Sequence, residues 1–270
     1  MSGNGFARYE ADGIVWYSCI ALGNLPGIRH GFSTRSGGTS AAPEGSLNLG
    51  YVPWDTRANV RENRRRFLSG IGVKPDSLAT IAQIHSTELH IVRSRADQWD
   101  SSIRGDALAT TERGVTLAVQ VADCFPILFA DPHARAVAAV HAGWRGMLAR
   151  ILGRTLEGMR NQLNTNAAEM LVALGPGIRS CCFEVGLEIA SAFQIEFPGM
   201  EVCSPRAGAE CKFLVDLPRA AAIQLLEAGV PLENIFDSCL CTRCRPLEFF
   251  SHRAEGVRAG RMMGIICSSE

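Results

Sequence analysis

Short runs of apolar residues, each ended by a polar or charged residue, dominate the middle of the chain. Three of them follow one another and are bounded by turn residues: Thr116–Val121, Ile127–Ala130 and Ala136–Val140. Apolar runs of this length predict buried strands. Cys124 and His141 come just after two of these runs. We therefore expect both side chains at the rim of a sheet, where many α/β proteins have their sites.

Apolar residues at helical spacing alternate with these strands along the rest of the chain. Helices are expected at 55–70, 147–163, 187–197 and 218–228, and further strands at 14–19, 78–92, 170–174, 213–217, 249–253 and 260–266. We see no linker, low-complexity block or internal repeat. The pattern therefore favours one domain over residues 1–270 that contains both strands and helices.

Composition restricts the class of protein. Lys and Arg total 27, Asp and Glu total 27, and the formal net charge is zero, which argues against nucleic acid as a main partner. The N-terminus lacks a basic segment followed by an apolar run, and no apolar span reaches ~20 residues, so we expect neither a secretion signal nor a membrane passage. We therefore expect a cytoplasmic protein whose ten cysteines are reduced and mostly buried.

Three residues form the most informative chemical set. His85, Cys124 and His141 are separated by 39 and 17 residues, unlike the close ligand pairs of zinc fingers. Two imidazoles and a thiolate from separate strand ends indicate a catalytic zinc with an open fourth position for water or substrate. Asp123 either orients a ligand, acts as an acid or base, or caps the strand end.

Two other chemistries use the same atoms. Cys124 could be a nucleophile with His141 as its base, as in a thiol hydrolase, although His85 then has no role. The set could also hold one copper ion in a trigonal site. A full multicopper site needs around ten imidazoles, and the chain has six histidines. A non-catalytic binding module stays open as well.

Other segments carry weaker signals. The loop from Gly31 to Gly38 is rich in glycine and hydroxyl groups and holds Arg35, so it suits either an anion or an ordinary turn. Asn48 stands between two leucines and needs a hydrogen-bond partner or a ligand. In one unbroken strand, His85 and His90 would face opposite sides, so that only one of them could join a given site.

The remaining cysteines give no clear site. Cys239, Cys241 and Cys244 resemble one half of a zinc ribbon, but a ribbon needs a second pair at matching spacing and none is evident. Cys181 and Cys182 are adjacent, and a direct disulfide between them would be strained. We therefore expect these two as free thiols.

Taken together, several motifs resemble the laccase-domain family, also called the multicopper polyphenol oxidoreductase or purine nucleoside phosphorylase family. They occur in order over about residues 30–266: Gly31-Phe-Ser-Thr-Arg-Ser-Gly-Gly38, Ser46-Leu-Asn-Leu-Gly50, Gln83-Ile-His85, Ala122-Asp-Cys124-Phe-Pro126, His141-Ala-Gly-Trp-Arg-Gly146, Gly175-Pro-Gly-Ile178, Cys181-Cys-Phe-Glu-Val-Gly186, Cys241-Thr-Arg-Cys244 and Phe249-Phe-Ser-His-Arg253. Ser86 replaces the usual glycine, and Ala254 replaces a frequent second arginine.

The resemblance implies an α+β fold in three layers, with a mixed β-sheet packed between helices, related to a bacterial toxin with a Cys/His hydrolase site. It implies zinc at His85, Cys124 and His141, and copper under an older description as a polyphenol oxidase. It also implies phosphorolysis of adenosine, inosine, guanosine and methylthioadenosine to base and pentose 1-phosphate, and deamination of adenosine. We expect a monomer or homodimer.

Phosphorolysis needs donors that hold phosphate beside the ribose. Arg35, Asn48 and Arg145 are the candidates, since arginine pairs with phosphate through two hydrogen bonds. The purine needs a flat apolar slot, for which we consider Phe125, Phe183 and Cys182. The helix start after His141 is a further place for an anion.

Overall fold

The computed structural model describes residues 5–41, 43–94, 103–133 and 136–269, and every structural statement below concerns these residues. Twelve of their strands form two mixed six-stranded sheets. The first sheet has the order β1 (Phe6–Ala11), β2 (Ile14–Cys19), β3 (Ile28–Ser33), β17 (Met262–Ser268), β9 (Thr116–Val121) and β6 (Leu78–Ala79). The second has the order β16 (Ile235–Asp237), β12 (Leu171–Leu174), β10 (Phe125–Asp131), β11 (Ala136–Ala142), β8 (Ala107–Thr110) and β7 (Leu89–Ile91).

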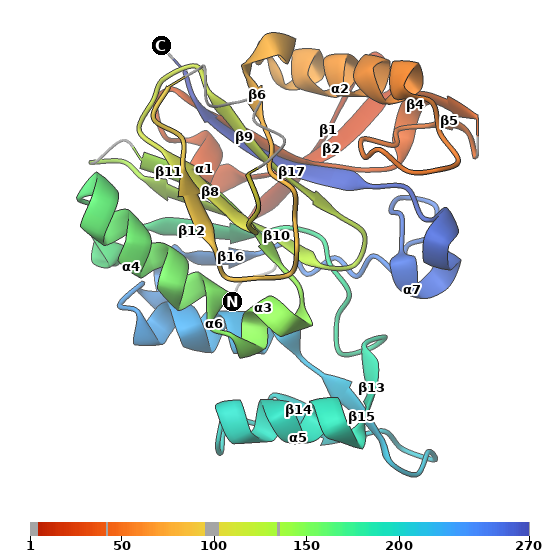
Figure 1. Cartoon of the computed structure of the whole chain (residues 1–270), viewed down its shortest axis with the longest axis vertical. Coiled ribbons are helices and arrows are strands. Elements are labelled where there is room, and N and C mark those ends of the chain that lie inside the picture. The colour runs from red at the N-terminus through yellow and green to blue at the C-terminus, as the bar shows by residue number, and fades with distance from the viewer. Residues whose placement is uncertain (1–4, 42, 95–102, 134–135, 270) are drawn as a thin grey trace.

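The two sheets pack face to face between helices (Figure 1). The helix α2 (Arg57–Ile71) covers the outer face of the first sheet. The outer face of the second sheet is covered by α3 (Trp144–Leu148), α4 (Ile151–Leu163) and α6 (Leu217–Glu227). The α+β class predicted from the sequence is confirmed, but the strands are divided between two sheets, so there are four layers where three were expected.

The strand β10 shows why the central runs are apolar throughout. Leu128 and Ala130 belong to the core between the two sheets, whereas Ile127 and Phe129 belong to the core under the helices. Both faces of this strand are therefore buried, and no alternation of polar residues is possible. Cys124 and His141 lie at the ends of β10 and β11, which pair antiparallel with Pro126 opposite His141.

The remaining elements form a small lobe and local turns. A three-stranded sheet of β13 (Glu184–Gly186), β15 (Lys212–Val215) and β14 (Cys203–Pro205) packs with α5 (Leu187–Glu196) and projects at the bottom of Figure 1. The shorter elements are α1 (Ile20–Gly23), α7 (His252–Glu255), β4 (Ser36–Ala41) and β5 (Glu44–Ser46). None of the described helices has the length and apolarity that a bilayer crossing requires.

Helix boundaries follow capping residues where these are clear. The Thr56 hydroxyl accepts the Asn59 N–H at the start of α2, and Gly72, with φ of 80°, ends it, as the sequence predicts. The helix expected over 147–163 starts earlier and breaks at Arg150, which adopts φ of 62°. The Arg150 side chain pairs with Glu196 and Glu227, so tertiary contacts hold this irregular backbone.

Two expected strands were wrong. The segment 78–92 is interrupted after β6 by a loop in which His85 has φ of 58°, so the argument from strand parity does not apply to His85 and His90. The segment 249–253 instead leads into α7, because the Ser251 side chain caps it by accepting the Ala254 N–H. The prediction of a single domain over 1–270 stays a prediction.

Candidate metal centre

His85, Cys124 and His141 come together at one end of the second sheet. Their donor atoms all lie within 4.8 Å of one another, and the two imidazole rings meet edge to face with centroids 4.9 Å apart. Each residue comes from a different segment: the loop before β7, the start of β10 and the end of β11. Imidazole nitrogens and a thiolate are the donors that zinc prefers, so this donor set fits one zinc ion.

Asp106 at the start of β8 organises two of the three donors. Its carboxylate is fully buried and accepts the backbone N–H groups of His85 and Ser86 at 3.0 and 2.5 Å. It also lies 2.8 Å from Nδ1 of His141. This contact leaves Nε2 of His141 for a metal, an arrangement common among metal-binding histidines. Asp106 was not among the site residues predicted from the sequence, although a carboxylate beside an apolar strand needs partners.

The electrostatics of the cluster favour a thiolate. Burial raises the pKa of Cys124, but attraction to His141 and hydrogen bonds from both histidines outweigh it and lower the pKa to about 6. Burial lowers the pKa of His141, but Cys124 and Asp106 raise it to about 9. Near neutral pH these shifts favour a thiolate beside an imidazolium in the metal-free site, and a bound cation would take the place of the proton.

Gly143 is required by the space around the cluster. A Cβ atom at this position would lie 2.9 Å from Cys124 Sγ and 3.3 Å from His85 Cδ2. Any larger residue would therefore push the sulfur or the imidazole out of place. This contact explains why glycine follows His141 and Ala142.

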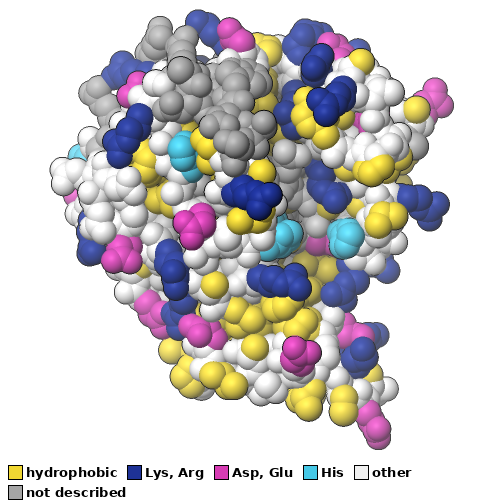
Figure 2. All heavy atoms as spheres, viewed as in Figure 1, with side chains coloured by type: hydrophobic (Ala, Val, Ile, Leu, Met, Phe, Trp, Pro, Cys, Tyr) yellow, Lys and Arg dark blue, Asp and Glu magenta, His cyan; other side chains and the backbone are white. Residues whose placement is uncertain are grey.

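The cluster opens into a cavity of about 470 Å³, large enough for a small ligand. Its lining comprises Tyr51, Ile81, Ala82, Gln83, His85, Gln120, Ala122, Cys124, His141, His252 and Arg261. Gln83 exchanges two hydrogen bonds with the backbone of Gln120, at 2.8 and 2.7 Å, and so fixes the His85 loop on β9. In the view of Figure 2, histidine side chains lie near the middle of the visible face of the molecule, with Lys or Arg side chains around them.

Arg261 supplies the guanidinium of this cavity and was not predicted. Its backbone N–H donates to Asn48 Oδ1 at 2.9 Å, and Nη1 donates to the carbonyls of Ala259 and Gly260. Asn48 is fully buried and also bonds Asp55 and Gly50. Asn48 therefore has protein partners and holds the backbone of Arg261, which is the first of the two alternatives considered for it; the second was a ligand such as phosphate.

The two other arginines predicted to bind phosphate lie elsewhere. Arg35 donates to the carbonyls of Pro246 and Phe249 and pairs with Glu255 at 2.7 Å. It therefore ties β4 to the C-terminal segment and does not line the cavity. Arg145 is exposed, and its guanidinium lies over the ring of Trp144. The helix α3 that begins beside it has only five residues.

Asp123 faces away from the cluster that its neighbour Cys124 joins. Its carboxylate accepts hydrogen bonds from the Thr242 hydroxyl at 2.6 Å, the Ser251 hydroxyl at 3.1 Å and the Arg253 N–H at 2.6 Å. Its carbonyl accepts the N–H of Ile178 at 2.8 Å. These bonds agree with the structural alternative considered for Asp123, in which the carboxylate fixes the strand end and not a substrate.

The residues considered for a purine slot are also placed elsewhere. Phe125 is fully buried inside the second sheet, and Phe183 is almost buried under the guanidinium of Arg253. Cys182 belongs to a second group of four sulfur atoms. The ring that does line the cavity is Tyr51, which is half exposed and contacts Arg64.

Comparison with known proteins identifies the family of this chain. Residues 29–269 match the family described as multi-copper polyphenol oxidoreductase laccase. The purine nucleoside phosphorylase YlmD of Geobacillus stearothermophilus is 33% identical over 265 residues, which cover 96% of each chain. The adenosine deaminase RL5, from an unknown prokaryotic organism, is 35% identical over 221 residues, which cover 80% of this chain and 84% of RL5.

Solved structures share the fold. The crystal structure of YlmD from Geobacillus stearothermophilus superposes with a TM-score of 0.87 at 33% identity, covering 97% of this chain and 98% of that one. Sequence motifs, fold and cluster thus point the same way, and this chain belongs to the multi-copper polyphenol oxidoreductase laccase family.

Proposed function

We propose that this protein is a zinc-dependent purine nucleoside phosphorylase that also deaminates adenosine. Adenosine, inosine, guanosine and methylthioadenosine are the proposed substrates of phosphorolysis. The observation that carries the proposal is the His85–Cys124–His141 cluster at the edge of a cavity, in a chain whose relatives are named for these two activities. The proposal includes a cytoplasmic enzyme that works as a monomer or homodimer.

The three donors hold the metal in this proposal. Two imidazoles and one thiolate leave part of a tetrahedral shell open on the cavity side. When bound, zinc would supply Lewis acidity at that position. Copper at the same donors is the alternative, and metal analysis of protein purified without added metal distinguishes the two.

Arg261 and Tyr51 replace the substrate contacts predicted from the sequence. In phosphorolysis a phosphate oxygen forms a bond to C1′ of the ribose while the bond from C1′ to the purine nitrogen breaks. The guanidinium of Arg261 lines the cavity and is suited to hold the phosphate. The exposed face of Tyr51 at the same cavity offers an apolar surface for the purine ring.

Incubation with adenosine tests both activities at once. With phosphate present we expect adenine and ribose 1-phosphate, and without phosphate only inosine, each separated by chromatography. Formation of neither product by metal-loaded protein would refute the proposal.

Arg261→Gln tests the proposed phosphate contact. A lost hydrogen bond to a charged group costs roughly 1.5–3 kcal/mol, so we expect the KM for phosphate to rise at least about tenfold. Deamination, which needs no phosphate, should keep its kcat. Arg258→Gln is the matched control, because Arg258 is exposed, lies three residues away and does not line the cavity. An unchanged KM in Arg261→Gln would exclude this role.

A further inference from the structure

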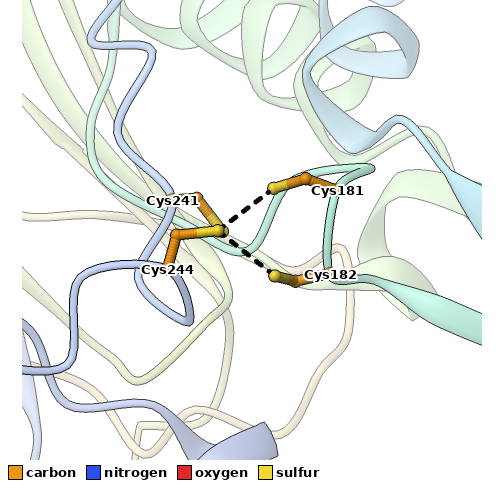
Figure 3. Close-up of side chains that lie close together, drawn as sticks. All are labelled: Cys181, Cys182, Cys241 and Cys244. Carbon is orange, nitrogen blue, oxygen red and sulfur yellow. Dashed lines mark hydrogen bonds between the residues drawn. The ribbon is translucent and has the colours of Figure 1, made fainter.

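Four cysteines from two distant parts of the chain converge outside the cavity. Cys181 and Cys182 follow β12, and Cys241 and Cys244 follow β16. Because β12 and β16 are parallel neighbours, the loops after them leave the same edge of the sheet. The four sulfur atoms all lie within 4.8 Å of one another, and the side chains point toward a common centre (Figure 3).

We propose that Cys181, Cys182, Cys241 and Cys244 bind a second zinc ion in a closed, structural tetrathiolate site. The sequence disfavours a zinc ribbon, because it shows no second pair with the spacing of Cys241 and Cys244. The structure supplies that pair as two adjacent residues. This inference goes beyond the proposed enzyme activity and does not depend on it.

The sulfur geometry suits one ion better than two disulfides. A tetrahedral zinc with bonds of about 2.3 Å places its sulfurs roughly 3.8 Å apart. Cys244 Sγ lies 3.5 Å from Cys181 Sγ and 3.3 Å from Cys182 Sγ, so it approaches two partners almost equally. A disulfide would need one partner at about 2.05 Å. Four thiolates also fill all four positions of zinc, which is typical of a structural site.

The backbone around the cluster stabilises the sulfur of Cys241 and fixes the two loops. Cys241 Sγ accepts backbone hydrogen bonds from Arg179 and Cys244, and such donors stabilise a sulfur that carries charge. Gly177 and Cys241 form a parallel bridge. Arg179 pairs with Asp237 through two bonds at 2.8 and 2.7 Å. These contacts fix the two loops against each other at their base, while the exposed Cys181 and Cys244 keep the cluster accessible to metal.

The second site would also stabilise the strand end that carries Cys124 of the first cluster. The Thr242 hydroxyl, between two of the cysteines, donates to the Asp123 carboxylate, and the Ile178 N–H donates to the Asp123 carbonyl. Both loops therefore donate hydrogen bonds to Asp123, the residue next to Cys124. An ion that joins the loops would hold this strand end in place without contacting substrate.

The test counts metal in protein purified under reducing conditions without chelator. We expect two zinc ions per chain in the natural protein and one each in His85→Ala and Cys244→Ser. In His85→Ala, X-ray absorption at the zinc edge should show four sulfur ligands at about 2.3 Å. This result is independent of any activity on nucleosides. Cys239→Ser is the matched control, since Cys239 is exposed and belongs to neither cluster, and it should keep both ions.

Stability gives the second measurement. Cys244→Ser should unfold at a lower temperature than the natural protein, because a zinc ion bound to the folded state stabilises that state. Added zinc should not raise the unfolding temperature of the variant to the natural value, because the variant lacks the second site. One zinc in the natural protein and none in His85→Ala would overturn the proposal, even if the Cys244→Ser variant failed to fold. In protein purified without reductant, a mass lower by two hydrogens per cysteine pair would overturn the proposal as well, since it would show disulfides.

Discussion

The two sulfur-containing clusters differ in how many donors they offer and in what surrounds them. The first has three donors from three segments and opens into the cavity. The second has four thiols from two neighbouring loops, and none of its members lines that cavity. An incomplete donor set beside a cavity suits chemistry on a ligand, whereas a complete one suits the fixing of backbone.

The contacts that hold the two clusters in place also differ. At the first cluster the buried Asp106 bonds the imidazole of His141 and the backbone at His85, so that two donors are oriented from one group. At the second, the loops are held by the Arg179–Asp237 pair and by backbone bonds. Damage to the first should therefore change activity, and damage to the second should change stability.

Loss of one donor from the first cluster should give the largest effect. His85→Ala removes an imidazole that the zinc proposal requires, so we expect the rate of adenosine turnover to fall by more than the roughly 10–100-fold that loss of an orienting group costs. Metal content should fall by one ion per chain. His133→Ala is the control, because His133 is exposed, its side chain pairs with Glu169 at the surface, and it belongs to neither cluster.

The same variant separates the zinc enzyme from a thiol hydrolase. In a hydrolase, Cys124 would attack and His141 would serve as its base, and His85 would not be needed. Full activity in His85→Ala together with its loss in Cys124→Ser would thus contradict the metal proposal. Several copper ions per chain with blue absorbance would instead favour the oxidase.

Asp106→Asn should have the next largest effect. The variant keeps the size of the side chain but places an amide against N–H donors, so His141 and the His85 loop lose part of their orientation. We expect metal affinity and turnover to fall roughly 10–100-fold, with the second zinc retained. Asp131→Asn removes another buried carboxylate, at the far end of β10, and should leave both metal sites intact. Equal losses in the two variants would mean that Asp106 only stabilises the fold.

Gly143→Ala tests the tight contact at the first cluster. The added methyl group would lie 2.9 Å from Cys124 Sγ, and overpacking of this kind costs roughly 1–3 kcal/mol. Competition with a chelator should therefore show metal affinity lowered by about tenfold. Gly153→Ala is the matched control, because nothing lies within 4 Å of its added methyl group. Unchanged metal affinity in Gly143→Ala would show that the cluster can shift to accommodate the methyl group, and it would contradict this prediction.

The three donors could be predicted from the sequence because they follow local patterns. Cys124 and His141 stand directly after apolar runs that could only be buried strands, and antiparallel pairing of β10 and β11 brings these ends together. His85 was predicted to join Cys124 and His141, and the structure brings the three together, but it lies in a loop and not in the expected strand. Its positive φ occurs in a loop held by the bond from the His85 N–H to Asp106 and by the bonds between Gln83 and the Gln120 backbone, and such tertiary contacts leave no local signal.

Non-local contacts also explain what was missed. Arg261 and Asn48 are more than 200 residues apart and meet only because β17 is placed inside the first sheet. Arg35 looked like an anion-binding residue because its loop is polar, yet its partners lie near residue 250. The four-cysteine cluster depends on a parallel pairing of β12 and β16. Spacing along the chain cannot reveal a pair formed in this way.

The smallest effect is expected at His30, a buried histidine outside both clusters. It tests how much of the loss of stability in acid arises away from the metal sites. His30 is almost fully buried, and its Nε2 accepts the Cys19 N–H at 2.9 Å. Burial lowers the pKa of His30 to about 4, below the value of about 6.5 in an unfolded chain. The unfolded state therefore binds the proton first as the pH falls from 6.5 toward 4, and the stability that His30 contributes above pH 6.5 is lost over this window.

His30→Gln should remove this part of the acid sensitivity. Between pH 7.5 and 5 we expect the free energy of unfolding of the natural protein to fall by about 1–2 kcal/mol more than that of the variant, as measured by urea titration. Neither cluster contains His30, so protonation of the metal ligands affects the natural protein and the variant equally. It therefore cancels when the changes in their free energies of unfolding are subtracted. His133→Gln, at an exposed site, should behave like the natural protein. If His30→Gln lost stability with acid as steeply as the natural protein, the acid sensitivity would originate at groups other than His30, and this assignment would be wrong.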